Sequence, residues 1–171
     1  MAPVVVLIGP PGSGKTSVGA RLARVLGTEL RDTDADIEAA QGRSVADIFV
    51  SDGEDHFRQL ERAAVAKAIA EHDGVLSLGG GAPIDERTQA ILTEYVADGG
   101  VVVFLDISLT AAVPRVGLNA TRPLLLGNPR QKWLALMNDR RPVYERLATM
   151  TVLTDNRRPS LIAAEIAEAV S

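Results

Sequence analysis

The sequence lacks cysteine, and no apolar run in it approaches the ~20 residues that a membrane-spanning helix needs. Without cysteine there is neither a disulfide framework nor a thiolate metal site, which fits a reducing compartment, and we expect the protein to be cytoplasmic. The lack of long apolar runs predicts that a membrane is not its partner. The N-terminus has no basic segment before its apolar residues, so we expect no signal peptide.

An excess of positive charge is also missing. The formal net charge is −4 and the isoelectric point is about 5.2, whereas nucleic-acid-binding domains are more usually basic, so we expect no nucleic-acid partner. Hydrophobic residues make up 46% of the chain and charged residues 23%, which is typical of a globular protein. A length of 171 residues suits one domain with a sizeable core, spanning residues 1–171, and we expect a monomer.

The strongest pattern present lies near the N-terminus. Five apolar residues at 4–8 predict a buried strand, and residues 9–16 then match the phosphate-binding loop G-x-x-x-x-G-K-[ST]. Its glycines let main-chain N–H groups approach phosphate oxygens, which a side chain would block. Lys15 can reach the outer phosphates, and the Thr16 hydroxyl is placed to bind Mg²⁺. The alternative is a glycine-rich turn with an incidental lysine.

Strand and helix patterns alternate along the rest of the chain. We expect further strands at 29–34, 74–78, 101–106 and 149–154. We expect a first helix that ends at Gly27, and further helices at 35–41, 45–50, 54–72, 85–96, 110–117, 131–147 and 161–170. This order predicts an α/β fold of three layers, in which a five-stranded parallel sheet carries helices on both faces. In such folds the ligand lies beyond the carboxyl ends of the strands.

Two carboxylates end the second expected strand. Asp32 and Asp34 are two residues apart, so at strand periodicity their side chains point the same way. One of them can hold Mg²⁺, and the other can orient and deprotonate a substrate hydroxyl. The alternative is an Asp-rich turn in which Asp34 caps the helix that follows.

Three further patterns favour a binding site. Residues 79–81 are consecutive glycines after a buried strand, whose N–H groups can bind an oxygen-rich substrate. Arg58 precedes Glu61 by three residues, which at least predicts a helical ion pair. Arg122 lies in a loop without clear periodicity, and such an arginine beside a phosphate site is typical of a lid over the nucleotide. The simpler alternatives are a solvated i, i+3 ion pair for Arg58 and an ordinary solvated arginine for Arg122.

Taken in order, these stretches resemble the shikimate kinase family: GPPGSGKT at 9–16, DTD at 32–34, GEDHFR at 53–58, LGGG at 78–81, TRPLL at 121–125 and R-x-P-x-Y at 140–144. The resemblance implies the P-loop fold of nucleoside-monophosphate kinases, with a substrate-binding region at about 33–61 and a lid at about 117–129. It also implies transfer of the ATP γ-phosphoryl group, with Mg²⁺, to the 3-hydroxyl of shikimate. The product would be shikimate 3-phosphate, in the pathway to chorismate and the aromatic amino acids.

The resemblance implies a role for each matching residue. The catalytic residues would be Asp34, Lys15 and Arg122. Shikimate would be bound by Asp34, Arg58, Gly80, Gly81 and Arg140, of which Arg140 is chosen over Arg141 by its spacing to Pro142 and Tyr144. Mg²⁺ would be held by Thr16 and Asp32. ATP would be bound by Gly12, Ser13, Gly14, Lys15, Thr16, Ser17, Arg115, Arg122, Arg157 and Pro159.

Two alternative functions stay open at this point. A gluconate kinase also phosphorylates a small substrate with hydroxyls and a carboxylate. A P-loop ATPase or nucleotide-driven switch would use residues 102–106 as a Walker-B strand with Asp106 as the metal residue, whereas the family resemblance makes Asp106 a structural strand end. A GTPase is disfavoured because neither N-K-x-D nor D-x-x-G occurs in the sequence.

Overall fold

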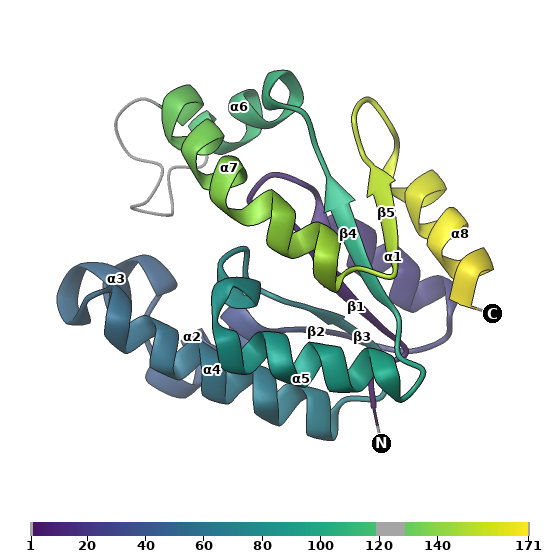
Figure 1. Ribbon diagram of the computed structural model, residues 1–171, viewed down its shortest axis with the longest axis horizontal. Helices are drawn as coiled ribbons and strands as arrows, with labels where there is room; N and C mark the ends of the chain where they lie inside the picture. Colours follow the sequence, from purple (N-terminus) through teal and green to yellow (C-terminus); the bar gives the residue numbers. More distant parts are fainter. Residues whose placement is uncertain (1, 119–128, 171) are drawn as a thin grey trace.

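A five-stranded parallel sheet forms the centre of the computed structural model, which describes residues 2–118 and 129–170 (Figure 1). The strands lie in the order β2-β3-β1-β4-β5, and every pair of neighbours is parallel. Their bounds are β1 Val5–Ile8, β2 Leu30–Asp32, β3 Val75–Ser77, β4 Val102–Asp106 and β5 Met150–Leu153. The predicted α/β class, with five parallel strands, is confirmed.

Helices cover both faces of this sheet because its central strand, β1, is apolar and buried at every position. Val5 and Leu7 face the helices α1 (Lys15–Val25) and α8 (Pro159–Val170), while Val6 and Ile8 face the opposite core. That second core is covered by α4 (Glu54–Glu71), α5 (Glu86–Ala97) and α7 (Pro129–Leu147) (Figure 1). Strands buried on both faces read as continuous apolar runs, which is why the run at residues 4–8 predicts the centre of the sheet.

The remaining helices follow the carboxyl ends of the strands β2, β3 and β4. The strand β2 leads into α2 (Thr33–Gln41), and α3 (Val45–Asp52) follows it; both pack on α4 through a small core of Ile37, Val45, Ile48 and Phe57. A short 3-10 turn, η1 (Ala82–Ile84), precedes α5, and α6 (Leu109–Leu118) follows β4. In the part of the chain that the structure describes, no helix combines the length and apolar character required to cross a bilayer.

Most element boundaries shift by one or two residues from the sequence-based expectations, and two of these shifts have a clear local cause. The second strand ends at Asp32 rather than continuing through Asp34, because Asp32 is the N-cap of α2: its side chain accepts hydrogen bonds from the main-chain N–H groups of Asp34 and Ala35. The prediction that both carboxylates project from one strand face is therefore wrong. The last helix begins at Pro159, because proline suits a first helical turn, where its missing N–H would have no helical partner.

Candidate active site

The phosphate-binding loop joins β1 to α1 at the carboxyl edge of the sheet. Gly9 lies against β4 so closely that a Cβ there would be 2.5 Å from the carbonyl oxygen of Leu105. Gly14, with φ of 91°, is the N-cap of α1 and brings no side chain to cap it, so the first N–H groups of the helix remain directed at an incoming anion. The Lys15 ammonium donates hydrogen bonds to the carbonyls of Gly9 (2.7 Å) and Pro10 (3.1 Å). Residues 9–17 thus have the backbone arrangement that a phosphate-binding loop requires.

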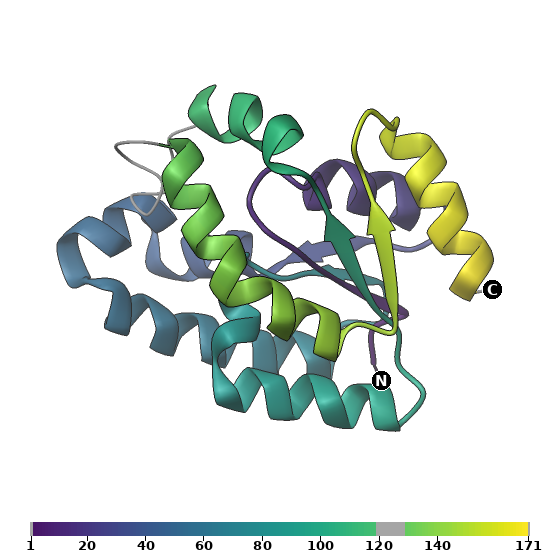
Figure 2. The ribbon, with the colours of Figure 1, turned by 45° about the horizontal axis from the view of Figure 1, so that its top comes forward.

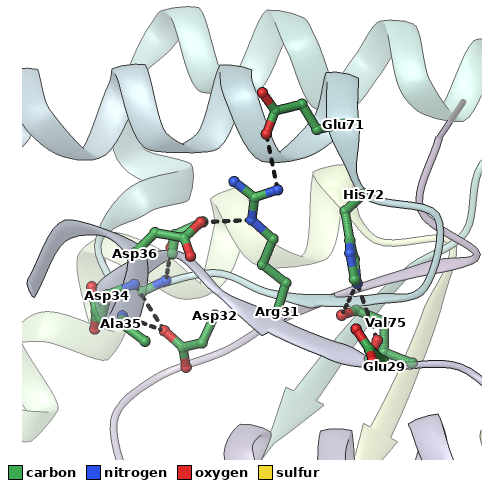
Figure 3. A network of polar contacts seen from close by, with 11 residues as sticks. Glu29, Arg31, Asp32, Asp34, Ala35, Asp36, Glu71, His72 and Val75 are labelled. Carbon is green, nitrogen blue, oxygen red and sulfur yellow. Dashed lines mark hydrogen bonds and ion pairs between the residues drawn. The ribbon is translucent and has the colours of Figure 1, made fainter. Parts of the chain in front are cut away.

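The turn from β2 into α2 holds the predicted metal ligand. Asp32 accepts from the N–H of Asp34 at 2.8 Å and from that of Ala35 at 3.3 Å (Figure 3). Burial, and then the charge of Asp34, raise the pKa of Asp32, while the charge of Lys15 acts in the opposite direction. A partly buried carboxylate that lies near another carboxylate and Lys15 is well suited to bind a cation that adjoins phosphates.

Hydrogen bonds from Arg31 and His72 stabilise the region around this turn. Arg31 donates from Nε to Asp36 at 2.7 Å and from Nη1 to Glu71 at 3.2 Å, and so ties the first turn of α2 to the end of α4 (Figure 3). Nearby, His72 Nε2 lies 3.1 Å from the carbonyl oxygen of Glu29 and 3.0 Å from that of Val75. The carboxylates of Asp32 and Asp34 are therefore carried by a turn whose backbone is held on both sides.

The three glycines at residues 79–81 bring the predicted substrate residues together. A Cβ on the first glycine would lie 2.7 Å from Asp34 Oδ1, and one on the third would lie 2.5 Å from both terminal nitrogens of Arg58. A Cβ on the middle glycine would lie 3.5 Å from Arg140 Nη1. Asp34, Arg58 and Arg140 come from three different helices and converge here on one short backbone segment. Side chains are absent from this segment because charged groups occupy the space that they would fill.

Arg58 is not the solvated ion pair of the simpler alternative. Its guanidinium donates to Glu61 Oε1 at 2.6 Å and lies 5.7 Å and 5.4 Å from the ring centres of Phe49 and Phe57. The Glu61 side chain is only 2% exposed, and the Arg58 side chain 19%. Sequence reasoning identified the pair but not the burial of Glu61, which depends on α4 facing the glycines. Glu61 and Phe49 are therefore additional residues of this site that orient Arg58.

The adjacent arginines of α7 point to different partners. Arg140 is 7% exposed and lies beside Gly80, whose carbonyl also accepts a hydrogen bond of 2.5 Å from the Tyr144 hydroxyl. Arg141 instead pairs with Asp106 at 2.6 Å. The choice of Arg140 from its spacing thus selects the arginine that faces the glycines. The sequence marks Tyr144 only as part of the R-x-P-x-Y motif, whereas the structure places its hydroxyl on the same glycine that Arg140 lies beside.

A cavity of about 350 Å³ opens beside this cluster. Arg58 and Arg140 both line it, together with Gly81 and the carboxylates of Glu54, Asp85 and Asp139. The two arginines predicted to bind a substrate carboxylate therefore face one space, although they are 82 residues apart in the sequence.

The predicted adenine-side residues are placed only in part. Arg157 follows β5, donates to the Leu153 carbonyl at 3.2 Å and pairs with Glu165 on α8, and Pro159 begins that helix. Both lie at the carboxyl end of β5, on the far side of the loop from Asp34. The side chain of Arg115 and the whole of Arg122 lie outside the described residues, as does most of the expected lid at 117–129.

The donor set fits magnesium better than a softer metal. Thr16 offers a hydroxyl and Asp32 a carboxylate, which are hard oxygen ligands, and Mg²⁺ usually combines one or two such groups with water and substrate phosphates. Among residues 2–118 and 129–170, no group of three or more histidine, aspartate or glutamate side chains forms an all-protein cage. The predicted metal residues therefore suit a metal that arrives with the nucleotide.

Comparison with known proteins decides the family. A family model described as shikimate kinase matches residues 11–171. The chain belongs to the shikimate kinase family. A shikimate kinase from Salinispora arenicola is 54% identical over 167 residues, which cover 98% of this chain and 97% of that relative. The solved shikimate kinase from Acinetobacter baumannii, in complex with shikimate, matches with a TM-score of 0.92 at 32% identity, covering 99% of this chain and 93% of that one.

The same comparisons bear on the alternatives. A gluconokinase from Sinorhizobium meliloti matches with a TM-score of 0.59 at 22% identity, covering 97% of this chain and 94% of that one, and it therefore shows a shared fold alone. Membership of the shikimate kinase family confirms the predicted enzyme class, a phosphotransferase that uses ATP, and favours neither the gluconate kinase nor the ATPase alternative. The monomeric state and the cytoplasmic location stay predictions.

Proposed function

We propose that this shikimate kinase family member transfers the γ-phosphoryl group of ATP to the 3-hydroxyl of shikimate, giving shikimate 3-phosphate and ADP. The observation that carries the proposal is the convergence of Asp34, Arg58 and Arg140 on residues 79–81, at the sheet edge that also holds the phosphate-binding loop. This pairs an anion-binding cradle with a second site that offers one carboxylate and two guanidinium groups. A small carboxylic acid with several hydroxyls matches that second site.

Shikimate would be held through its carboxylate by Arg58 and Arg140, with the main chain of Gly80 and Gly81 beside it. Hydrogen bonds between charged groups contribute about 1.5–3 kcal/mol each. Arg58 is already oriented by Glu61 and by the rings of Phe49 and Phe57, so little side-chain freedom is lost when substrate binds. Pre-orientation of this kind favours a rigid cyclic acid over a flexible linear one.

The opposite end of the substrate would meet Asp34. We assign to this carboxylate the orientation of the attacking hydroxyl and the acceptance of its proton. The hydroxyl oxygen forms a bond to the γ-phosphorus, and the bond from that phosphorus to the β–γ bridging oxygen breaks, so the electron pair leaves with ADP. The helix cap formed by Asp32 fixes the backbone of Asp34, which limits the directions in which this carboxylate can point.

The phosphate-binding loop and nearby residues would neutralise the negative charge of the ATP phosphates. Lys15 would move from the carbonyls of Gly9 and Pro10 to the outer phosphates, and Gly12, Ser13, Gly14 and Ser17 would complete the cradle. Thr16 and Asp32 would hold Mg²⁺, which when bound neutralises charge on the β- and γ-phosphates. Arg122 would stabilise the transferring group from the lid, and Arg115, Arg157 and Pro159 would border the adenine.

The test is ADP release with single acceptors. Purified protein is incubated with ATP and Mg²⁺ and with shikimate, gluconate, quinate or no acceptor, and the phosphorylated product is identified by phosphorus NMR. We expect release only with shikimate, and a phosphate monoester as product. Preferential use of gluconate would replace the proposed substrate, and equal release without any acceptor would replace the kinase with an ATPase.

A further inference from the structure

We propose that Arg141 is a positioning residue for Arg140. Its ion pair with Asp106 holds α7 against the end of β4 and so keeps the Arg140 guanidinium beside Gly80 before substrate arrives. The inference rests on the proposed function, because it takes Arg140 to bind the carboxylate of the acceptor. It gives the second member of the adjacent arginine pair a task that the family motif R-x-P-x-Y does not include.

Both side chains of the ion pair between Arg141 on α7 and Asp106 at the end of β4 make further contacts that fix their positions. Arg141 Nη1 lies 2.6 Å from Asp106 Oδ2, and the guanidinium carbon lies 6.0 Å from the ring centre of Phe104. The other carboxylate oxygen of Asp106 accepts a hydrogen bond of 2.8 Å from the N–H of Ile107. The side chains of Arg141 and Asp106 are 34% and 20% exposed, so this is a partly shielded contact rather than a freely rotating surface pair.

Asp106 is a rigid anchor for this contact. Its carbonyl oxygen accepts hydrogen bonds from both the N–H (2.9 Å) and the hydroxyl (3.0 Å) of Thr154, which follows β5. The residue before it, Leu105, is the one whose carbonyl oxygen lies against Gly9 of the phosphate-binding loop. Arg141 therefore attaches α7 to the part of the sheet that also carries the nucleotide site.

The helix needs an attachment at this turn because Pro142 follows at once. Proline has no N–H, so it cannot donate the helical hydrogen bond to the carbonyl of Asn138, and the helix loses one restraint where the arginines lie. After Pro142, the Tyr144 hydroxyl binds the carbonyl of Gly80. On the N-terminal side of Pro142, the ion pair between Arg141 and Asp106 holds the helix in the same way. Figure 2 shows α7 passing across the sheet, from beside α6 to the start of β5.

The experiment compares shikimate kinetics in Arg141→Met, Asp106→Asn and the double variant, with Arg146→Met as the matched control. Arg146 is on the same helix but donates to Gln89 of α5 instead. We expect each single variant, and the double variant equally, to raise the KM for shikimate about five-fold with kcat and the KM for ATP nearly unchanged. Arg146→Met leaves all three at wild-type values.

Two further measurements separate positioning from general loss of structure. Arg141→Lys keeps the charge but not the planar fork, so it should fall between Arg141→Met and wild type. Trp133, the single tryptophan of the chain, is buried on α7 and reports this helix. We expect its emission without substrate to differ between Arg141→Met and wild type, and the difference to shrink when shikimate saturates the site.

Several outcomes overturn the inference while leaving the proposed function intact. A wild-type shikimate KM in Arg141→Met would remove the positioning role, and so would additive effects of the two single substitutions. A fall in kcat with an altered Mg²⁺ requirement in Asp106→Asn alone would make Asp106 a metal residue instead. Failure of the proposed function is seen separately, because wild-type protein would then release no ADP in response to shikimate.

Discussion

Asp32 accepts a hydrogen bond of 2.8 Å from the main-chain N–H of Asp34, so the predicted metal ligand is also the cap of the helix that carries the predicted base. The two carboxylates are thus mechanically connected through the first turn of α2 rather than arranged along a strand. Because burial and the charge of Asp34 raise the pKa of Asp32, its ionised form costs folding free energy until a cation compensates it.

Asp32→Asn should therefore separate stability from activity. An acid whose pKa is raised by folding makes the folded state less stable as pH rises from its unfolded pKa, about 3.9, through its folded pKa, and the whole penalty is present above both. Asparagine caps helices as well as aspartate and carries no charge. We expect the unfolding temperature at neutral pH to stay equal or rise and the difference to vanish in acid, while Mg²⁺-dependent activity falls about 10- to 100-fold.

Asp47→Asn is the control for this substitution, since Asp47 lies in the first turn of α3, away from the carboxylate pair. It should change neither activity nor the Mg²⁺ requirement. Thermal unfolding across pH and a Mg²⁺ titration of initial rates measure both quantities. A large loss of stability at neutral pH in Asp32→Asn would contradict the assigned cause of the raised pKa.

Asp34→Asn should stop phosphoryl transfer and spare nucleotide binding. The amide keeps the size of the side chain but cannot accept the proton of the acceptor hydroxyl, and loss of such a group typically lowers kcat about 10²- to 10⁴-fold. Nucleotide affinity, measured by calorimetry with a non-hydrolysable ATP analogue, should remain near the wild-type value. Turnover at the wild-type rate would remove Asp34 from the reaction.

Gly81→Ala tests the convergence on the three glycines. Gly81 has φ of −91°, which any residue adopts, so the effect of alanine comes from contact and not from backbone strain. The new Cβ would lie 2.5 Å from both terminal nitrogens of Arg58, which is the far end of a flexible side chain and can shift. We expect normal folding but a shikimate KM raised about ten-fold, with the KM for ATP unchanged.

Gly42→Ala is the control for this substitution, because we expect it to change stability and not shikimate binding. Gly42 is the C-cap of α2 with φ of 64°, and a Cβ there would meet open space. It should lower the free energy of unfolding by about 1 kcal/mol through strain and leave the shikimate KM alone. Equal kinetic effects of the two substitutions would mean that loss of stability, and not displacement of Arg58, explains the result for Gly81.

Arg62→Met should weaken the protein only above acid pH. Arg62 donates from Nε (3.0 Å) and Nη2 (2.8 Å) to Asp85, which caps α5, and these hydrogen bonds hold the pKa of Asp85 below its ordinary value. A depressed carboxyl pKa contributes stability that is present above the unfolded value, about 3.9, and is lost as pH falls through the folded value. The unfolding temperature of Arg62→Met should therefore lie below wild type at neutral pH and converge with it in acid.

Arg87→Met serves as the comparison, because it removes the same charge from the first turn of α5, the helix that Asp85 caps, whereas Arg62 reaches Asp85 from α4. Its unfolding temperature should follow wild type at every pH. A gap between Arg62→Met and wild type that stays constant into strong acid would show that the arginine stabilises α4 and α5 by packing instead of through Asp85.

The local pattern of the sequence determined the fold and the phosphate-binding loop. Residues 4–16 carry most of this information locally: the apolar run predicts a buried strand, and the glycines beside Lys15 and Thr16 allow the backbone conformations of the loop, such as φ of 91° at Gly14. The glycines at 79–81 and the spacing of Arg140 to Tyr144 likewise marked a binding site, although only as short patterns without partners.

Tertiary structure decided which side chains meet. That Asp32 caps α2, that Gly81 lies under Arg58, and that Arg140 faces Gly80 while Arg141 faces Asp106 all depend on contacts between segments far apart in the chain. Backbone periodicity sets directions within one helix or strand, but the packing of helices on the sheet sets the contacts between them. Neighbours such as Arg140 and Arg141, which local sequence treats as nearly equivalent, therefore acquire different partners only when α7 is packed against the sheet.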